Sequence, residues 1–373
     1  MNPSIFVLSL TLSVLATSLS LVACAQSVPP GEMIAGLERK LDKPLDETKG
    51  ATIEYGSIAT RDGAKLRTIF SKPENATTPV PAIYFVQWLS CSTVELKDDD
   101  GWTQMLTHLI GKSGYAVLRT EKAGVGDSQG PACSDLDYNT EVSHHRESLG
   151  ALLARSDIDR DNVFVFGGSM GANQAALIAN DLDVAGFIVW GGGAKTWYER
   201  MLGFDRRSLE FSLEDLATLN ETLMARAAFH TEYLVKGKSP KAIIAENPKM
   251  EAIWSNMIGT DTNSHYGRPF AFHHQAQAAN WPSAWTNVSV PVLVLYGEYD
   301  WFDDADSHKL IADTVNRSEA GLADFRILPR TNHHFSRYPN AKAAFDETGG
   351  TMVGDEAAIV VADWVTEHIN ASK

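Results

Sequence analysis

Residues 163–172 read VFVFGGSMGA, and this stretch decides the fold. Its first four residues form a short, continuously apolar run, which is typical of a strand buried on both faces. Gly-x-Ser-x-Gly follows, with Ser169 between Gly167 and Gly171, and then a helical pattern begins. A serine on a tight turn from strand to helix needs small residues two positions to either side, so that the turn closes and the hydroxyl group stays exposed. The stretch therefore predicts a serine nucleophile at the start of a helix.

Similar apolar runs recur on both sides of this stretch. They lie at residues 83–86, 115–118, 187–190 and 292–295, and helical patterns separate them at residues 102–110, 140–153, 172–180, 307–315 and 356–369. Strands that alternate with helices indicate a mostly parallel sheet with helices on both faces. Upstream, residues 51–60 and 65–72 alternate in polarity around Asp62-Gly63, which predicts a β-hairpin.

Residues 195–286 interrupt this alternation. They carry no apolar run of the same kind and look helical. An insert between two strands of an open α/β sheet lies at the carboxyl edge of the sheet, where such folds bind ligands. We therefore expect residues 51–373 to form one α/β domain with a helical cap inserted at about 195–286.

The stretch around Ser169, together with two later segments, resembles the α/β-hydrolase family, and the resemblance extends from residue 51 to the end. In that family an acid follows a late strand and a histidine follows the last one. Residues 292–300, VLVLYGEYD, are similar to the strand and acid turn, and residues 325–335, FRILPRTNHHF, to the last strand and histidine loop. The resemblance implies an α/β-hydrolase fold with a catalytic triad of Ser169, Asp300 and His333.

Neighbouring residues compete for two of these roles. Three acidic residues lie close to Asp300, and we interpret them as a solvated acidic loop: Glu298, Asp303 and Asp304. His334 directly follows His333. The family's histidine usually stands two residues before an aromatic residue, and Phe335 in that position favours His333.

Two backbone N–H groups are expected to bind the oxyanion. One belongs to Met170, directly after the nucleophile, and the other to the loop after residues 83–86. That loop commonly begins His-Gly in the family, whereas residues 87–91 read QWLSC here. We expect Leu89 to be this donor, with Trp88 as the alternative. Residues 119–130 also resemble a family loop, and we interpret them as a structural turn, because they lack the third glycine of a dinucleotide-binding motif.

The composition fits a globular protein, with 44% hydrophobic and 21% charged residues among 373. The 32 basic and 47 acidic side chains give a net charge of −15, which argues against nucleic acid or an anionic membrane surface as the main partner. Three cysteines, Cys24, Cys91 and Cys133, lack the spacing of metal ligands. We therefore expect no metal, and the resemblance to the α/β-hydrolase family implies no cofactor and a small-molecule or peptide acyl substrate.

The N-terminal segment indicates export. Residues 1–25 carry no charged side chain, residues 5–23 are almost entirely apolar or small, and residues 23–25, ACA, fit a signal-peptide cleavage site. Residues 21–24, LVAC, also resemble a bacterial lipobox, in which Cys24 would be lipidated. An uncleaved membrane anchor is the alternative. We expect a signal peptide at 1–25 and a linker at 26–50, with the chain periplasmic, membrane-anchored or secreted.

Export also bears on the other two cysteines. Once Cys24 is removed or lipidated, Cys91 and Cys133 remain in a compartment where disulfides persist. In the family's sheet the strands that precede them are neighbours, so their loops leave the same edge within reach of each other. We expect a Cys91–Cys133 disulfide that holds the Leu89 loop. Two buried free thiols are the alternative.

These features together predict a secreted serine hydrolase that cleaves a carboxylic ester. Ser169 would attack the acyl carbon, His333 would take its proton, and Asp300 would orient the imidazole. A peptidase or amidase with the same triad is the alternative, because only the substrate pocket separates the two reactions. A non-catalytic surface lipoprotein that retains the fold is a second alternative.

Overall fold

A central eight-stranded sheet organises the computed structural model, which describes residues 36–96, 100–212 and 215–371. The strand order is β1-β2-β4-β3-β5-β6-β9-β10. In chain order the strands are β1 (Ala51–Ala59), β2 (Lys65–Pro73), β3 (Val80–Val86), β4 (Ala116–Thr120), β5 (Ile158–Gly168), β6 (Gly186–Trp190), β9 (Val292–Gly297) and β10 (Ala323–Leu328). β2 pairs antiparallel with β1 and β4, and every other pair in this sheet is parallel. The predicted mostly parallel sheet and the predicted hairpin are confirmed.

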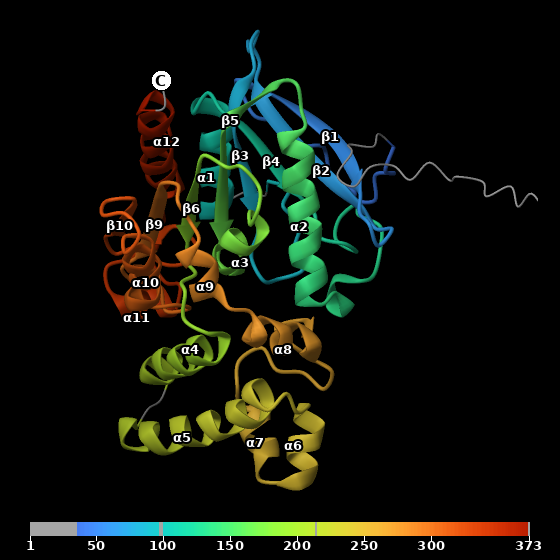
Figure 1. Cartoon of the computed structure of the whole chain (residues 1–373). Helices are drawn as coiled ribbons and strands as arrows, with labels where there is room; N and C mark the ends of the chain where they lie inside the picture. Colours follow the sequence, from blue (N-terminus) through green and yellow to red (C-terminus); the bar gives the residue numbers. More distant parts are fainter. Residues whose placement is uncertain (1–35, 97–99, 213–214, 372–373) are drawn as a thin grey trace, which may run out of the picture.

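Helices cover both faces of this sheet (Figure 1). On one face lie α1 (Gly101–Lys112) and α12 (Gly354–Ala371), and on the other lie α2 (Tyr138–Leu153), α3 (Met170–Ile178), α9 (Trp281–Thr286) and α10 (Ala305–Val315). Successive residues of β3 alternate between the two cores: Ile83 and Phe85 pack toward α1 and α12, and Tyr84 and Val86 toward α2 and α3. Both faces of the strand are apolar for this reason, which explains the continuous apolar runs.

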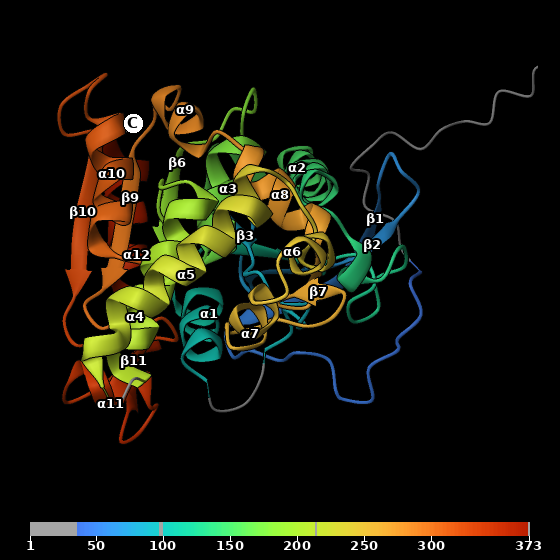
Figure 2. The same ribbon diagram turned by 90° about the horizontal axis from the view of Figure 1, so that it is seen from below.

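Most residues between β6 and β9 form a separate helical layer. It contains α4 (Trp197–Ser212), α5 (Leu219–His230), α6 (Pro240–Glu246), α7 (Met250–Ser255) and α8 (Phe270–Ala278), with the two-residue strands β7 (Ser264–His265) and β8 (Arg268–Pro269). These helices lie below the sheet in Figure 1 and in front of its end in Figure 2. Their aromatic core, which includes Trp197, Phe204 and Tyr233, continues into Met170. The layer therefore packs directly on the turn that carries Ser169.

Smaller elements complete the chain. After β10 come β11 (Ser336–Arg337), α11 (Ala341–Phe345) and β12 (Thr351–Met352), and β11 pairs with β12. Near the N-terminal end of the described residues, Arg39 forms ion pairs with Glu95 and Asp127. The predicted signal peptide and Cys24 lie outside the described residues. Within the described ranges, no helix is both long and apolar enough to cross a membrane.

Candidate active site

Ser169 occupies a strained turn between β5 and α3. Its backbone has φ 56° and ψ −117°, a conformation that residues with a side chain rarely adopt. The Ser169 N–H donates to the carbonyl of Trp190 at 2.7 Å, which fastens the turn to β6. A Cβ atom on Gly171 would overlap the carbonyl oxygen of Val86, and one on Gly167 would overlap that of Gly171. The two glycines of the motif thus allow α3 to pack on the end of β3.

His333 and Asp300 form a close, buried pair. Nδ1 of His333 lies 2.7 Å from Oδ2 of Asp300. The other carboxylate oxygen accepts the N–H of Phe302 at 2.8 Å, which fixes its orientation. The side chains of His333 and Asp300 are 6% and 0% exposed. With Nδ1 donating to the carboxylate, Nε2 of His333 is left as the basic nitrogen.

Burial and pairing set the charge states of these two residues. Burial lowers the pKa of His333 below its ordinary 6.5, and the attraction of Asp300 opposes only part of this effect. Burial acts to raise the pKa of Asp300, but the attraction and hydrogen bond of His333, the attraction of His308 and the N–H of Phe302 together outweigh it and hold this pKa below its usual value. At neutral pH the imidazole is therefore neutral and the carboxyl group ionised. These are the states that a general base and its orienting acid require.

The acids that compete with Asp300 have other partners. Glu298 accepts a backbone N–H at 2.7 Å, and Asp304 caps the N-terminus of α10. Asp303 is fully buried, accepts the N–H of Gly193 at 3.0 Å and faces Arg200 at 3.4 Å. The prediction of a solvated acidic loop is therefore wrong for Asp303, because Arg200 compensates its charge inside the protein.

The two adjacent histidines differ in their surroundings. Nδ1 of His334 lies 3.2 Å from Glu347, and its side chain is 44% exposed. The structure thus brings His333, and not His334, to Asp300. Gly191 makes room for this imidazole, since a Cβ atom on Gly191 would lie 2.5 Å from Cε1 of His333. The sequence holds a signal for this contact that the prediction did not use: three glycines in a row directly after a buried strand.

A cavity of about 460 Å³ lies at Ser169 and His333, both of which line it. The volume falls in the range of small-molecule sites. Most of the large side chains in its wall are apolar: Trp88, Leu89, Trp102, Leu106, Trp197, Met201, Phe204, Tyr266 and Phe302. The sheet-end loops and α4 both contribute to this wall. The cavity could therefore enclose an apolar group next to the hydroxyl of Ser169.

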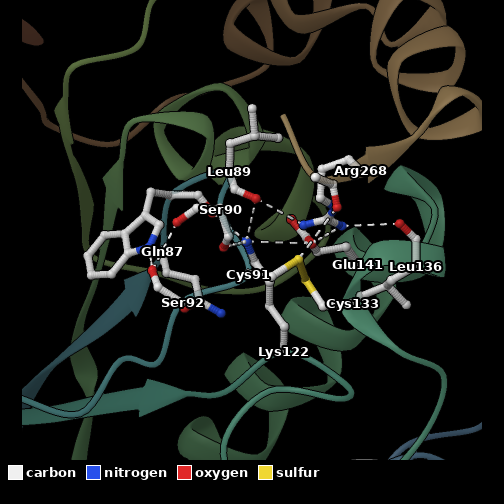
Figure 3. The surroundings of a disulfide bond; sticks show 12 residues. Gln87, Leu89, Ser90, Cys91, Ser92, Lys122, Cys133, Leu136, Glu141 and Arg268 are labelled. Atoms are coloured by element: carbon white, nitrogen blue, oxygen red, sulfur yellow. Dashed lines mark hydrogen bonds and ion pairs between the residues drawn. A yellow bond between two sulfur atoms is a disulfide. The ribbon is translucent and has the colours of Figure 1, made fainter. Parts of the chain in front are cut away.

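The residues expected to bind an oxyanion flank this cavity. Met170 is the first residue of α3, where backbone N–H groups lack an acceptor within the helix, and Leu89 and Trp88 line the cavity. Cys91, two residues beyond Leu89, is joined to Cys133 by a disulfide with a Cα–Cα distance of 5.8 Å (Figure 3). The expected disulfide is therefore present, and it fastens the Leu89 loop to the start of a 3-10 turn at Cys133–Asp135.

A charged cluster that was not predicted from the sequence lies behind the Leu89 loop. Lys122, Glu141 and Arg268 have side chains exposed by 1% or less. Lys122 belongs to the loop interpreted as a structural turn, and its side chain contacts residues 88–90. A signal was present in the sequence: Glu121-Lys122 places two charges directly after a buried strand, at the edge that carries the site.

Comparisons with known proteins agree with this architecture. No curated protein matches the chain. Among solved structures, an esterase from Pyrococcus furiosus is 12% identical, with 90% of this chain and 98% of that one covered and a TM-score of 0.51. A proline iminopeptidase from Mycobacterium smegmatis is 16% identical, with 86% and 100% covered and a TM-score of 0.51. These likenesses show the fold alone.

The family comparison covers more than half of the chain. The model of the alpha/beta hydrolase fold matches residues 98–335, a range that includes Ser169, Asp300 and His333. The chain therefore belongs to the alpha/beta hydrolase family.

Proposed function

We propose that this chain is a serine hydrolase that cleaves carboxylic esters. The 2.7 Å contact between His333 and Asp300, beside a cavity that Ser169 also lines, carries the proposal. The hydroxyl oxygen of Ser169 attacks the ester carbonyl while Nε2 of His333 takes its proton. The imidazolium then returns this proton to the leaving alkoxide, which departs as an alcohol. Water, deprotonated by His333, cleaves the resulting acyl-enzyme to the carboxylic acid.

The N–H groups of Met170 and Leu89 would stabilise the negative charge that develops on the carbonyl oxygen. Such preorganised donors commonly make the largest single contribution to acyl transfer. Asp300 keeps the imidazole in the tautomer that presents Nε2 and stabilises the imidazolium.

The cavity wall favours an ester with an apolar acyl group over a peptide with a free amino terminus. Binding the amino terminus of a peptide requires a carboxylate that is free to pair with it. Among the described residues, the acidic side chains that line the cavity already have other partners. Glu95 pairs with Arg39 and Lys43, while Asp100 caps the N-terminus of α1. The large apolar side chains that remain suit a hydrocarbon or aromatic group.

A fluorophosphonate probe tests the nucleophile. We expect the probe to label the wild-type protein at Ser169, as mapped by mass spectrometry, and not to label Ser169→Ala. Loss of a triad nucleophile typically removes most of a roughly million-fold acceleration, so ester hydrolysis should also vanish. Ser113→Ala, at the C-terminal cap of α1, is the control and should keep both labelling and activity. Labelling that persists in Ser169→Ala would overturn the assignment.

A side-by-side substrate panel tests the reaction class. We expect p-nitrophenyl esters to be cleaved with a higher kcat/KM than aminoacyl p-nitroanilides that carry the same side chain. Faster cleavage of the anilides would identify a peptidase or amidase instead.

We further propose that the mature chain lies outside the cytoplasm. The apolar N-terminal sequence and the Cys91–Cys133 disulfide support this location, because disulfides persist in oxidising compartments. Mass determination of the mature N-terminus in a bacterial host should find cleavage between residues 23 and 26, with a lipid on Cys24 if the lipobox is used. A full-length, uncleaved chain in the cytosolic fraction would contradict export.

A further inference from the structure

One buried ammonium group contacts three successive carbonyls of the Leu89 loop. Nζ of Lys122 donates to the carbonyl oxygens of Trp88, Leu89 and Ser90, the latter two at 3.1 Å (Figure 3). An ammonium group has three donors, so this loop takes all of them. Removing an ammonium ion from water costs several kcal/mol. This desolvation cost argues against a purely structural role for the charged side chain of Lys122.

The geometry of the peptide bond gives this contact a consequence for the opposite side of the loop. In a trans peptide the C=O and N–H bonds point in opposite directions. The carbonyl of Trp88 and the N–H of Leu89 belong to the same peptide, so a carbonyl held by Lys122 directs the Leu89 N–H away from it. The same relation links the Leu89 carbonyl to the N–H of Ser90. Leu89 and Ser90 both line the cavity that Ser169 lines.

A second cation reaches the same loop from the helical layer. Arg268, in β8, donates to the carbonyl of Leu89 at 3.0 Å and to Glu141 at 2.5 Å. Glu141 also lies 3.7 Å from Lys122. Two cations and one carboxylate therefore meet behind the loop, and Glu121 adds its charge only where it is ionised, above its pKa of about 7. Below that pH, positive charge is left behind the peptides of residues 88–90, which line the cavity together with Ser169. Fixed positive potential of this kind favours a negative charge that develops in a transition state.

We propose that Lys122 is a positioning residue of the oxyanion site: by holding the carbonyls of residues 88–90 it aims the N–H groups of Leu89 and Ser90 at the carbonyl oxygen of the substrate. The role rests on the proposed function of Ser169. It also assigns Ser90 as a second donor candidate in this loop.

The titratable groups around Lys122 make the arrangement sensitive to pH. Burial lowers the pKa of Lys122 to about 7, although the attraction of Glu141 opposes this shift. Burial acts to raise the pKa of Glu141, but Lys122 and Arg268 outweigh it and lower this pKa to about 2. Burial raises the pKa of Glu121 to about 7 and lowers that of His145 to about 4. Within this cluster, Lys122 is the cation that loses its proton near neutrality.

Lys122→Met tests the proposal in the full-length protein, because methionine has a similar length and no donor. We expect kcat for a p-nitrophenyl ester to fall by about 10- to 100-fold, somewhat less than the loss of a direct oxyanion donor, with KM changed by less than about twofold. A phenylboronic acid forms a tetrahedral anion on the nucleophilic serine, so its inhibition constant should rise by a similar factor. Binding of an unreactive ether analogue of the ester should not change.

Lys40→Met is the matched control. Lys40 also donates to a loop carbonyl, that of Ser128 at 2.8 Å, but does not contact residues 88–90. We expect its kcat and its boronate affinity to equal those of the wild type. Lys122→Gln keeps an amide donor and should retain part of the activity. If Lys122→Met does not fold, Lys122→Gln decides by the same measurements.

The outcomes separate the two proposals. A wild-type protein that the fluorophosphonate labels at Ser169, with a folded Lys122 variant of unchanged kcat and boronate affinity, overturns the role of Lys122 alone. Equal weakening of the binding of the boronate and of the ether analogue also overturns it, because that result indicates a general distortion of the cavity. Absence of labelling in the wild type overturns both proposals.

Discussion

The indole Nε1 of Trp190 donates a hydrogen bond of 3.0 Å to the backbone carbonyl of His333. The backbone carbonyl of the same tryptophan accepts the N–H of Ser169 at 2.7 Å. One residue at the end of β6 thus fastens the turn of the proposed nucleophile and the loop of the proposed base. Its ring also stacks on Phe335 with the centroids 4.2 Å apart. The relative position of Ser169 and His333 therefore depends on Trp190.

Trp190→Phe should lower kcat by more than the accompanying loss of folding stability would explain. Phenylalanine keeps an aromatic ring but leaves the His333 carbonyl without its donor, which costs about 1–3 kcal/mol of stability for a buried group. A small displacement of the base should lower kcat by about 5- to 50-fold. Esterase kinetics and thermal unfolding check both effects.

Trp285→Phe provides the matched control, because Trp285 is equally buried but its Nε1 has no hydrogen-bond partner among the described residues. It should lose stability through packing while its kcat stays near the wild-type value. Equal losses of kcat in both variants would contradict the role given to Trp190.

The pH profile of kcat/KM should be bell-shaped. His333 acts in its neutral form and its pKa lies below 6.5, so activity should rise with pH on a limb below pH 6.5. Lys122 acts in its protonated form with a pKa of about 7, so activity should decline as the pH rises through about 7. The decline should be absent in Lys122→Met. A flat profile from about pH 5 to 9, with chemistry limiting the rate, would contradict the assignment of His333.

Local sequence patterns were sufficient to predict the sheet and the turn at Ser169. Strands such as β3 and β5 are buried on both faces, and this environment leaves a continuous apolar run in the sequence. The strained turn requires Gly167 and Gly171, because atoms of the backbone fill the space that a side chain would take. The apolar runs come from one repeated environment, and the space at Gly167 is filled by residues close in the chain, whereas Gly171 is required by the distant Val86 at the end of β3.

The charged cluster behind the Leu89 loop could not be found in the same way. Lys122 follows β4, Glu141 lies in α2 and Arg268 lies in β8, and their pairing depends on tertiary packing. Asp303 was misjudged for the same reason, since Arg200 compensates its burial from another element. For the two adjacent histidines the sequence favours His333 only through the position of Phe335, and the packing of the final loop is what brings His333 to Asp300.

Asp300→Asn should test which acid orients the imidazole. An amide in this position can stabilise the wrong tautomer of His333 and cannot stabilise the imidazolium, so kcat should fall by up to about 10⁴-fold. Glu298→Gln is the control, because Glu298 accepts the backbone N–H of Arg330 and does not contact His333. Its kcat should remain close to that of the wild type. A larger loss in Glu298→Gln than in Asp300→Asn would reassign the acid.

Reduction of the Cys91–Cys133 disulfide should lower kcat more than it raises KM. The bond encloses a sequence separation of 42 residues, which corresponds to about 4 kcal/mol of stability in the chain-entropy model. It also anchors the Leu89 loop, whose N–H groups we propose to bind the oxyanion. We expect the Cys91→Ala, Cys133→Ala double variant to show the same kinetic change without reductant. Unchanged kcat in a folded double variant would show that Lys122 and Arg268 hold the loop without the disulfide.

Gly191→Ala should displace the imidazole of His333. Gly191 has φ +70°, and an added Cβ atom would lie 2.5 Å from Cε1 and 2.8 Å from Nδ1 of His333. The methyl group therefore competes with the ring for the space in which it contacts Asp300. Gly237→Ala separates this clash from backbone strain, because Gly237 has φ +69° and an added Cβ atom there meets nothing within 4 Å in the part of the chain that the structure describes. Both variants should lose about 1–2 kcal/mol of stability from the left-handed backbone.

The loss of activity should be specific to Gly191→Ala, with kcat lower by about 100-fold, since a shift of about 1 Å at a reacting group can cost this much. Steady-state kinetics, thermal unfolding and the rate of fluorophosphonate labelling measure the three effects. Similar activity in the two variants would show that the imidazole tolerates the methyl group and that Gly191 is needed for its backbone conformation alone.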